Sequence, residues 1–170
     1  AEDGIRDKLV TGVQTCALPI FPLTIALTIV SASTCAPLAN AAVYLWHCDR
    51  LGRYSLYSSG VTNQNYLRGV QAADANGKLT FQTIYPGCYS GRWPHIHFEV
   101  YVSLAAATAV SNKKATSQIA LPKTTNDLVY AATGYETSKT NAGQITLASD
   151  NVFSDGSGLQ LATMSEIGRA

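Results

Sequence analysis

The feature of this 170-residue chain that most restricts its fold is a set of short runs in which apolar and polar residues alternate. In Phe21–Val30 the leucines and isoleucines fall on one parity and two threonines on the other. A period of two describes a half-buried strand, and it argues against the core of a signal peptide. The same alternation recurs in Lys78–Ile84 and His95–Val102. The chain is therefore predicted to consist mainly of strands.

Residues typical of turns separate these runs. Pro37–Asn40 and Asp74–Gly77 each precede a predicted strand. Only Asn126–Thr133 reads as a short helix, with Asn126 as its N-cap. The remaining predicted strands are Ala41–Cys48, Ser117–Leu121 and Gln144–Ala148. We predict an all-β fold, a β-sandwich of mainly antiparallel strands with long loops and at most one short helix.

Composition excludes several classes of partner. Hydrophobic residues make up 46% of the chain and charged residues 14%, which suits one domain with a sizeable core. The formal net charge is +1 and no run of Lys or Arg stands out, so we predict no nucleic-acid partner. No apolar stretch has the length of a membrane helix, so we predict no membrane partner. Nothing in the sequence sets an oligomeric state.

The two ends of the chain look foreign to the rest. Gly12–Ile20 resembles a translated frame of a short-read sequencing adapter, and Glu166–Ala170 resembles a frame through its opposite strand. Matches at both ends favour this origin over an ordinary polar tail. We therefore expect non-native tails at 1–20 and 166–170 around one domain at 21–165. The native ends, with any targeting signal, would then be missing from the sequence.

The same expectation changes the cysteine count. Cys16 lies in the expected tail, which leaves Cys35, Cys48 and Cys88, an odd number. The twelve residues between Cys35 and Cys48 are mostly extended, which exceeds disulfide reach unless the chain folds back. The disulfide pairing stays open.

His95-Ile-His97 is the clearest sign of chemistry. Side chains alternate across a strand, so both histidines point to one face and lie within reach of one metal ion. Two histidines packed in a core or on a surface are the alternative. Glu99 shares their parity and is a weaker candidate donor.

Three blocks of sequence resemble the intradiol ring-cleavage dioxygenases, the family of catechol and protocatechuate dioxygenases. The blocks run from Trp46 to Ser55, from Thr83 to Tyr89 (TIYPGCY) and from Arg92 to His97 (RWPHIH), in the family's order and approximate spacing. The similarity spans roughly Pro22 to Met164. It is closest to the secreted branch of the family, on the segments Trp46–Asp49, Leu67–Gly69 and Asp150–Gly156.

The resemblance implies a ferric iron site. It makes Tyr54, Tyr89, His95 and His97 the ligands of Fe(III), with Tyr54 permanent and Tyr89 displaced by substrate. Arg92 matches the arginine that stabilises negative charge on the substrate. Phenolate is a hard anionic donor that suits a hard ferric ion, in contrast to the two-His-one-carboxylate sites of ferrous oxygenases.

Other residues receive lesser roles from the resemblance. Gln71, Cys88 and Gln118 are candidates for lining the substrate pocket, although Cys88 stands where secreted relatives usually carry an aromatic residue. His47 aligns with a position that binds no iron and is expected either in the core or supporting a ligand from behind. Three further tyrosines are expected to be packing residues rather than ligands: Tyr57, Tyr85 and Tyr101.

The function implied is cleavage of a catechol-type ring between its two hydroxyl-bearing carbons, with O2, to a cis,cis-muconate-type product. The partners would be the small-molecule catechol and O2, and the resemblance to the secreted branch implies an extracellular protein. A catalytically inactive or substrate-binding sandwich of the same fold is the alternative. A third possibility is that the same ligands hold copper or zinc.

Overall fold

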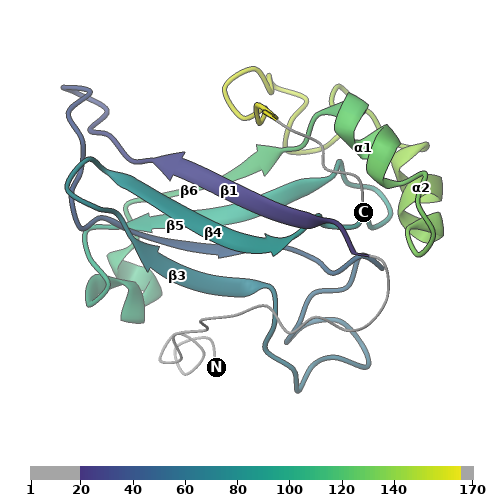
Figure 1. The fold of residues 1–170 in the computed structure, drawn as a ribbon, viewed down its shortest axis with the longest axis horizontal. Helices are drawn as coiled ribbons and strands as arrows, with labels where there is room; N and C mark the ends of the chain where they lie inside the picture. The colour runs from purple at the N-terminus through teal and green to yellow at the C-terminus, as the bar shows by residue number, and fades with distance from the viewer. Residues whose placement is uncertain (1–19, 166–170) are drawn as a thin grey trace.

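The computed structural model describes residues 20–165. Every pairing between its strands is antiparallel, in one sheet of order β1-β4 and another of order β3-β2-β5-β6. Figure 1 shows the first sheet lying across the second. The strands are β1 (Pro22–Thr28), β2 (Ala42–Trp46), β3 (Arg68–Ala72), β4 (Lys78–Ile84), β5 (His95–Tyr101) and β6 (Ala115–Ala120). The predicted all-β sandwich is confirmed.

The core between the sheets follows from the alternation. Leu23 and Ile25 of β1 are buried, as is Phe81 of β4, while the intervening threonines stay exposed. These side chains pack with Val43 of β2 and Ile96 of β5 in one hydrophobic cluster. Each such burial contributes roughly 1.5–3 kcal/mol. One face of the four-stranded sheet is thereby covered. The other face carries a second hydrophobic cluster around Ala42, Tyr44 and Tyr101, together with polar residues.

The prediction of at most one short helix is wrong for the described residues, which hold two. Helix α1 spans Lys123–Val129 and α2 spans Glu136–Ala142, both at one end of the sandwich (Figure 1). Asn126 is not an N-cap but lies inside α1, where its side chain accepts from Tyr85 Oη at 2.6 Å. Of the residues of α2 only Ser138 is buried, so its sequence carries no apolar stripe. Two single 3-10 turns, Ala106–Thr108 and Val110–Asn112, precede β6.

The prediction of a strand at Gln144–Ala148 is also wrong. The segment contains a turn in which the backbone N–H of Asp150 donates to the Thr146 carbonyl at 3.0 Å. Thr146 and Ser149 exchange side-chain and backbone hydrogen bonds. Such local bonds offer the backbone an alternative to a sheet ladder, which alternation alone does not reveal.

Cys35, Cys48 and Cys88 are all free thiols, Cys35 exposed and the other two buried. Cys16 lies outside the described residues, as do residues 1–19 and 166–170 of the expected non-native tails. Between residues 20 and 165, neither helix has the length and apolar character that crossing a membrane requires.

Candidate metal centre

One row of side chains crosses the four-stranded sheet on the face turned away from β1 and β4. Antiparallel pairing sets Arg68, Trp46, His97 and Gln118 next to one another across β3, β2, β5 and β6. Residues paired in this way point to the same face. His95 lies two residues before His97 on β5 and shares that face, as the alternation predicted.

Four predicted iron ligands come together at this row. The Nε2 atoms of His95 and His97 lie 3.0 Å apart. The phenol oxygens of Tyr54 and Tyr89 each lie 3.3 Å from His95 Nε2. Two oxygens and two nitrogens from three separate segments therefore converge on one point.

The contacts of His95 and His97 orient their rings. The Nδ1–H of His95 donates to the backbone carbonyl of Trp93, and because a carbonyl only accepts, Nδ1 carries the proton. The lone pair of Nε2 is then free to face the two phenols. The ring of His97 stacks on Trp46, with centroids 4.8 Å apart and an interplanar angle of 6°.

Asp49 organises the loop that carries Tyr54. Its carboxylate accepts from the backbone N–H groups of Leu51 and Arg53, both at 2.9 Å, and from Tyr66 Oη at 3.1 Å. It also pairs with the Arg53 guanidinium at 2.8 Å. One buried carboxylate thus holds several turns of an irregular segment together, and this explains how a loop residue is held in place.

The loop that carries Tyr89 packs tightly against the Tyr54 loop. A Cβ added at Gly87 would lie 2.6 Å from the carbonyl oxygens of Asp49 and Arg50. A Cβ added at Gly52, which has φ +79°, would likewise lie 3.0 Å from the Tyr89 Cβ. No larger residue fits at either glycine without displacing backbone. The Pro86-Gly87 turn therefore sets the distance between the two tyrosines.

Arg92 lies beside Tyr89 in a fixed orientation. Its Nε donates to Asp150 at 2.9 Å, one Nη donates to Gln118 Oε1 at 2.6 Å, and the other Nη lies 3.4 Å from Tyr89 Oη. Asp150 is fully buried and also accepts from the backbone N–H of Trp93 at 2.7 Å. The guanidinium is thus held next to the phenol oxygen of Tyr89.

The protonation states fit a bound cation. Burial lowers the pKa of His95 to about 4 and that of His97 to about 3, so both imidazoles are neutral and able to ligate at neutral pH. Burial also raises the pKa of the phenols of Tyr54 and Tyr89, which therefore ionise only if a cation lies between them.

A hard trivalent ion satisfies this set, because two phenolates offset most of its charge. Within residues 20–165 no three His, Cys, Asp or Glu side chains gather as a metal-binding group. The phenol oxygens are therefore needed to complete the four donors.

Of the three residues predicted to line the substrate pocket, only Gln118 lies beside the four donors. Gln118 lies in the row and contacts Arg92, as described above. Gln71 pairs with Val43, whose side chain is in the core between the sheets, so the register places Gln71 on the opposite face and contradicts its pocket assignment. Cys88 is 1% exposed, and its thiol contacts the carbonyl of Arg92 at 3.4 Å, behind the Tyr89 loop rather than among the four donors.

The remaining candidates lie away from the donors. His47 is buried, and its ring nitrogens bond to the Cys48 carbonyl and Thr83 Oγ1, both at 2.8 Å, as expected for a core residue. Glu99 instead accepts from Tyr101 Oη at 2.6 Å and pairs with Lys113 at 3.2 Å. Tyr85 and Tyr101 are buried packing residues. Tyr57 is 56% exposed, and its ring packs against the Arg68 guanidinium, 5.3 Å from the ring centroid, so it too is a packing residue.

Trp46, Asp49 and Asp150 support the site but were not assigned roles from the sequence. Trp46 falls in a block used for the family resemblance, and its pairing with His97 depends on a β2–β5 register that the sequence does not reveal. Asp150 is 58 residues from Arg92, so no local pattern connects them.

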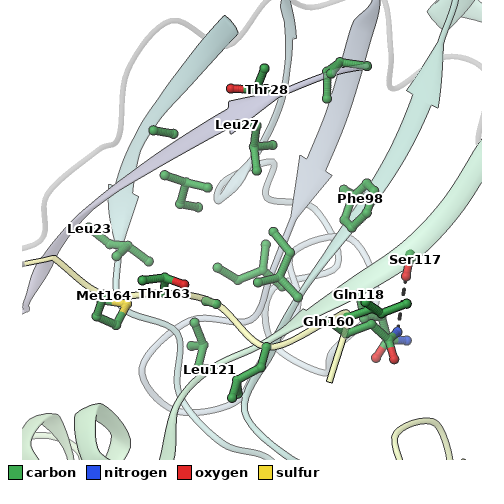
Figure 2. A pocket seen from close by; sticks show the side chains of 18 of the residues that line it. Leu23, Leu27, Thr28, Phe98, Ser117, Gln118, Leu121, Gln160, Thr163 and Met164 are labelled. Carbon is green, nitrogen blue, oxygen red and sulfur yellow. Dashed lines mark hydrogen bonds between the residues drawn. The ribbon is translucent and has the colours of Figure 1, made fainter. Parts of the chain in front are cut away.

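A separate pocket of about 510 Å³ opens between the sheets. Figure 2 shows Leu23, Leu27, Phe98 and Leu121 around it, with Met164 from the C-terminal segment. Its polar corner is a hydrogen bond from Gln160 Nε2 to Ser117 Oγ at 3.2 Å. Neither tyrosine nor histidine of the donor cluster lines it.

The buried His47 makes the stability of the iron-free protein depend on pH. Burial lowers its pKa from 6.5 to about 4, so between these values the unfolded chain binds a proton that the folded protein does not. The free energy of unfolding should therefore fall as the pH drops from about 6.5 to about 4, by up to about 3 kcal/mol for this residue. Urea unfolding at several pH values measures this slope, and the variant His47→Gln should show a shallower one. An unchanged slope in that variant would contradict the assignment.

The family model described as Dioxygenase matches residues 19–120, more than half of the chain and a range that contains all four donors. Catechol 1,2-dioxygenase 2 of Acinetobacter lwoffii is 41% identical over 54 residues, which are 32% of this chain and 19% of that protein. The chain thus spans about a fifth of the length of this curated relative.

Two solved structures share the fold. The intradiol ring-cleavage dioxygenase from Tetranychus urticae aligns with a TM-score of 0.73 and 26% identity, covering 88% of this chain and 73% of that one. Catechol 1,2-dioxygenase from Acinetobacter sp. ADP1 aligns with a TM-score of 0.53 and 25% identity, covering 65% of this chain and 40% of that one. The chain therefore belongs to the family of intradiol ring-cleavage dioxygenases.

Proposed function

We propose that the protein is a non-haem Fe(III) dioxygenase that opens catechol-type rings between the two hydroxyl-bearing carbons with O2, giving cis,cis-muconate-type products. The observation that carries the proposal is the convergence of Tyr54, Tyr89, His95 and His97 on one point. Ferric iron, when bound there, would bind the catechol through its oxygens and draw electron density from the ring, which would make the ring reactive toward dioxygen.

The residues of the chain supply the rest of the chemistry. Tyr89, which the incoming catechol would displace, would take up one proton from a substrate hydroxyl on its phenol oxygen. Arg92, 3.4 Å from that oxygen, stabilises the negative charge of the freed phenolate and of the catecholate. Asp150 and Gln118 keep the guanidinium in this orientation, so no reorganisation is needed when charge develops.

Metal loading and product analysis test the proposal. Protein loaded with Fe(III) should be red-brown from tyrosinate-to-iron charge transfer, whereas a zinc-loaded control should be colourless. Incubated with catechol and isotopically labelled dioxygen, it should form a muconate that carries both oxygen atoms. A coloured protein that binds catechol without opening the ring would support the inactive alternative. A colourless iron-loaded protein would exclude both tyrosines as ligands.

Replacing each tyrosine by phenylalanine in a separate variant distinguishes their roles. Tyr54→Phe should lose the charge-transfer band and most of its iron, because Tyr54 is proposed as the permanent ligand. Tyr89→Phe should keep substantial iron with a shifted colour, bind catechol anaerobically, and turn over slowly, because the proton acceptor beside Arg92 is gone. The measurement is iron content and the visible spectrum before and after anaerobic catechol. Equal iron loss in both variants would contradict the assignment.

A further inference from the structure

Arg68 of β3 is a buried cation at one end of the row of side chains that includes Trp46 and His97. The residue is only 7% exposed. All three guanidinium nitrogens donate hydrogen bonds. Nε donates to Ser55 Oγ at 3.0 Å and Nη2 to the Ser55 carbonyl at 2.8 Å. Nη1 donates to Tyr44 Oη at 2.8 Å. Burying a guanidinium is costly, and this geometry offsets the cost with charge-assisted hydrogen bonds.

At one end of this network, hydrogen bonds hold the loop that carries Tyr54. Ser55 follows Tyr54 directly, and the guanidinium holds it by both its side chain and its backbone. The Ser55 hydroxyl in turn donates to the Tyr66 carbonyl at 2.6 Å, which closes the loop on itself. A planar fork of this kind restrains both position and orientation of the backbone next to Tyr54, which a single ammonium does not.

The other end of the network reaches the support of His97. The Tyr44 ring stacks on Trp46 with centroids 5.2 Å apart, and Trp46 stacks on His97. Arg68 is also the direct cross-strand neighbour of Trp46. One side chain therefore connects the loop of one proposed ligand to the aromatic stack that holds another.

We propose that Arg68 is a positioning residue that sets the Tyr54 phenol against the histidine pair. This inference rests on the proposed function, because it takes Tyr54 as a ligand. Tyr89 is held by different groups: the Cys88 backbone on its N-terminal side accepts from Asn141 at 2.8 Å and donates to Ser138 at 2.9 Å. Arg68 is therefore expected to act on iron binding through Tyr54 and independently of Tyr89.

Iron affinity in two double-mutant cycles tests this. Arg68→Lys keeps the charge but loses the fork, and should weaken Fe(III) binding by about 10- to 100-fold in competition with a ferric chelator. Combined with Tyr54→Phe, it should cost clearly less than it does alone, because the residue it positions is already gone and only its contact with the Tyr44–Trp46 stack beside His97 is left to lose. Combined with Tyr89→Phe, the two losses should multiply. The charge-transfer band of the single variant should weaken.

The controls separate a positioning role from a general loss of stability. Arg50→Lys changes another arginine, which donates to the Gly134 carbonyl at 2.8 Å, and should leave iron affinity within about twofold of the wild type. If Arg68→Lys does not fold, as judged by the melting temperature of the iron-free protein, Ser55→Ala removes one arm of the fork and enters the same cycles. Losses that multiply with both tyrosine variants would overturn the inference. Wild-type iron affinity in Tyr54→Phe alone would instead overturn the proposed function.

Discussion

Replacing His95 or His97 by alanine is expected to remove most of the iron and leave a folded, colourless protein. Each variant deletes one of four converging donors, and the Nε2 atoms of the pair lie only 3.0 Å apart. Loss of a residue that merely orients a ligand costs 10- to 100-fold in metal affinity, so loss of the ligand itself should cost more than about 10²-fold. Iron content after dialysis, the visible spectrum and circular dichroism measure the three outcomes.

His47 is the matched control for this experiment. It is the third histidine of the chain, it is buried like His95, and its bonds go to the Cys48 carbonyl and Thr83 rather than to the donors. His47→Gln is expected to lower stability and retain iron and colour. Full colour in both His95→Ala and His97→Ala would remove the histidine pair from the site.

Arg92→Ala is expected to keep iron and colour but slow ring cleavage by about 10²- to 10³-fold, the usual cost of losing a preorganised charge partner. Its guanidinium approaches Tyr89 Oη and is held by Asp150 and Gln118. Single-turnover kinetics of the iron-loaded protein with catechol measure the effect. Asp150→Asn, which keeps a hydrogen bond but removes the charge, should show a smaller loss. Wild-type turnover in Arg92→Ala would exclude it from the reaction.

The strands could be predicted because their two faces meet different surroundings. In β1 and β4, every second side chain lies in the core and those between lie in solvent, so apolar and polar residue types alternate in the sequence as burial does in the structure. Strand β3 was not predicted, because Arg68 and Gly69 are not strand formers by pattern and the strand exists through its pairing with β2. Helix α2 was missed for a related reason, since it buries so little apolar surface.

Some residues of the candidate site could likewise be predicted from the sequence, and others could not. The shared face of His95 and His97 follows from a strand's period of two, and the two tyrosines and Arg92 came from motifs rather than from any local physical signal. Gln71 was misplaced because a shift of one residue moves a side chain to the other face of a sheet, and the register of β3 is set by its partner. The partner of Arg92, Asp150, depends on how a distant loop folds back.

The tight contact between the two tyrosine loops constrains how a ligand can leave. The backbone at Gly52 lies so near Tyr89 that an added Cβ would meet the Tyr89 Cβ at 3.0 Å, and helix α2 holds the preceding peptide through Ser138 and Asn141. A hinge movement of this loop would break these contacts. If Tyr89 gives way to substrate as proposed, rotation about its own side-chain bonds is the movement that keeps them. Side-chain rotation is a faster class of motion than the opening of a loop.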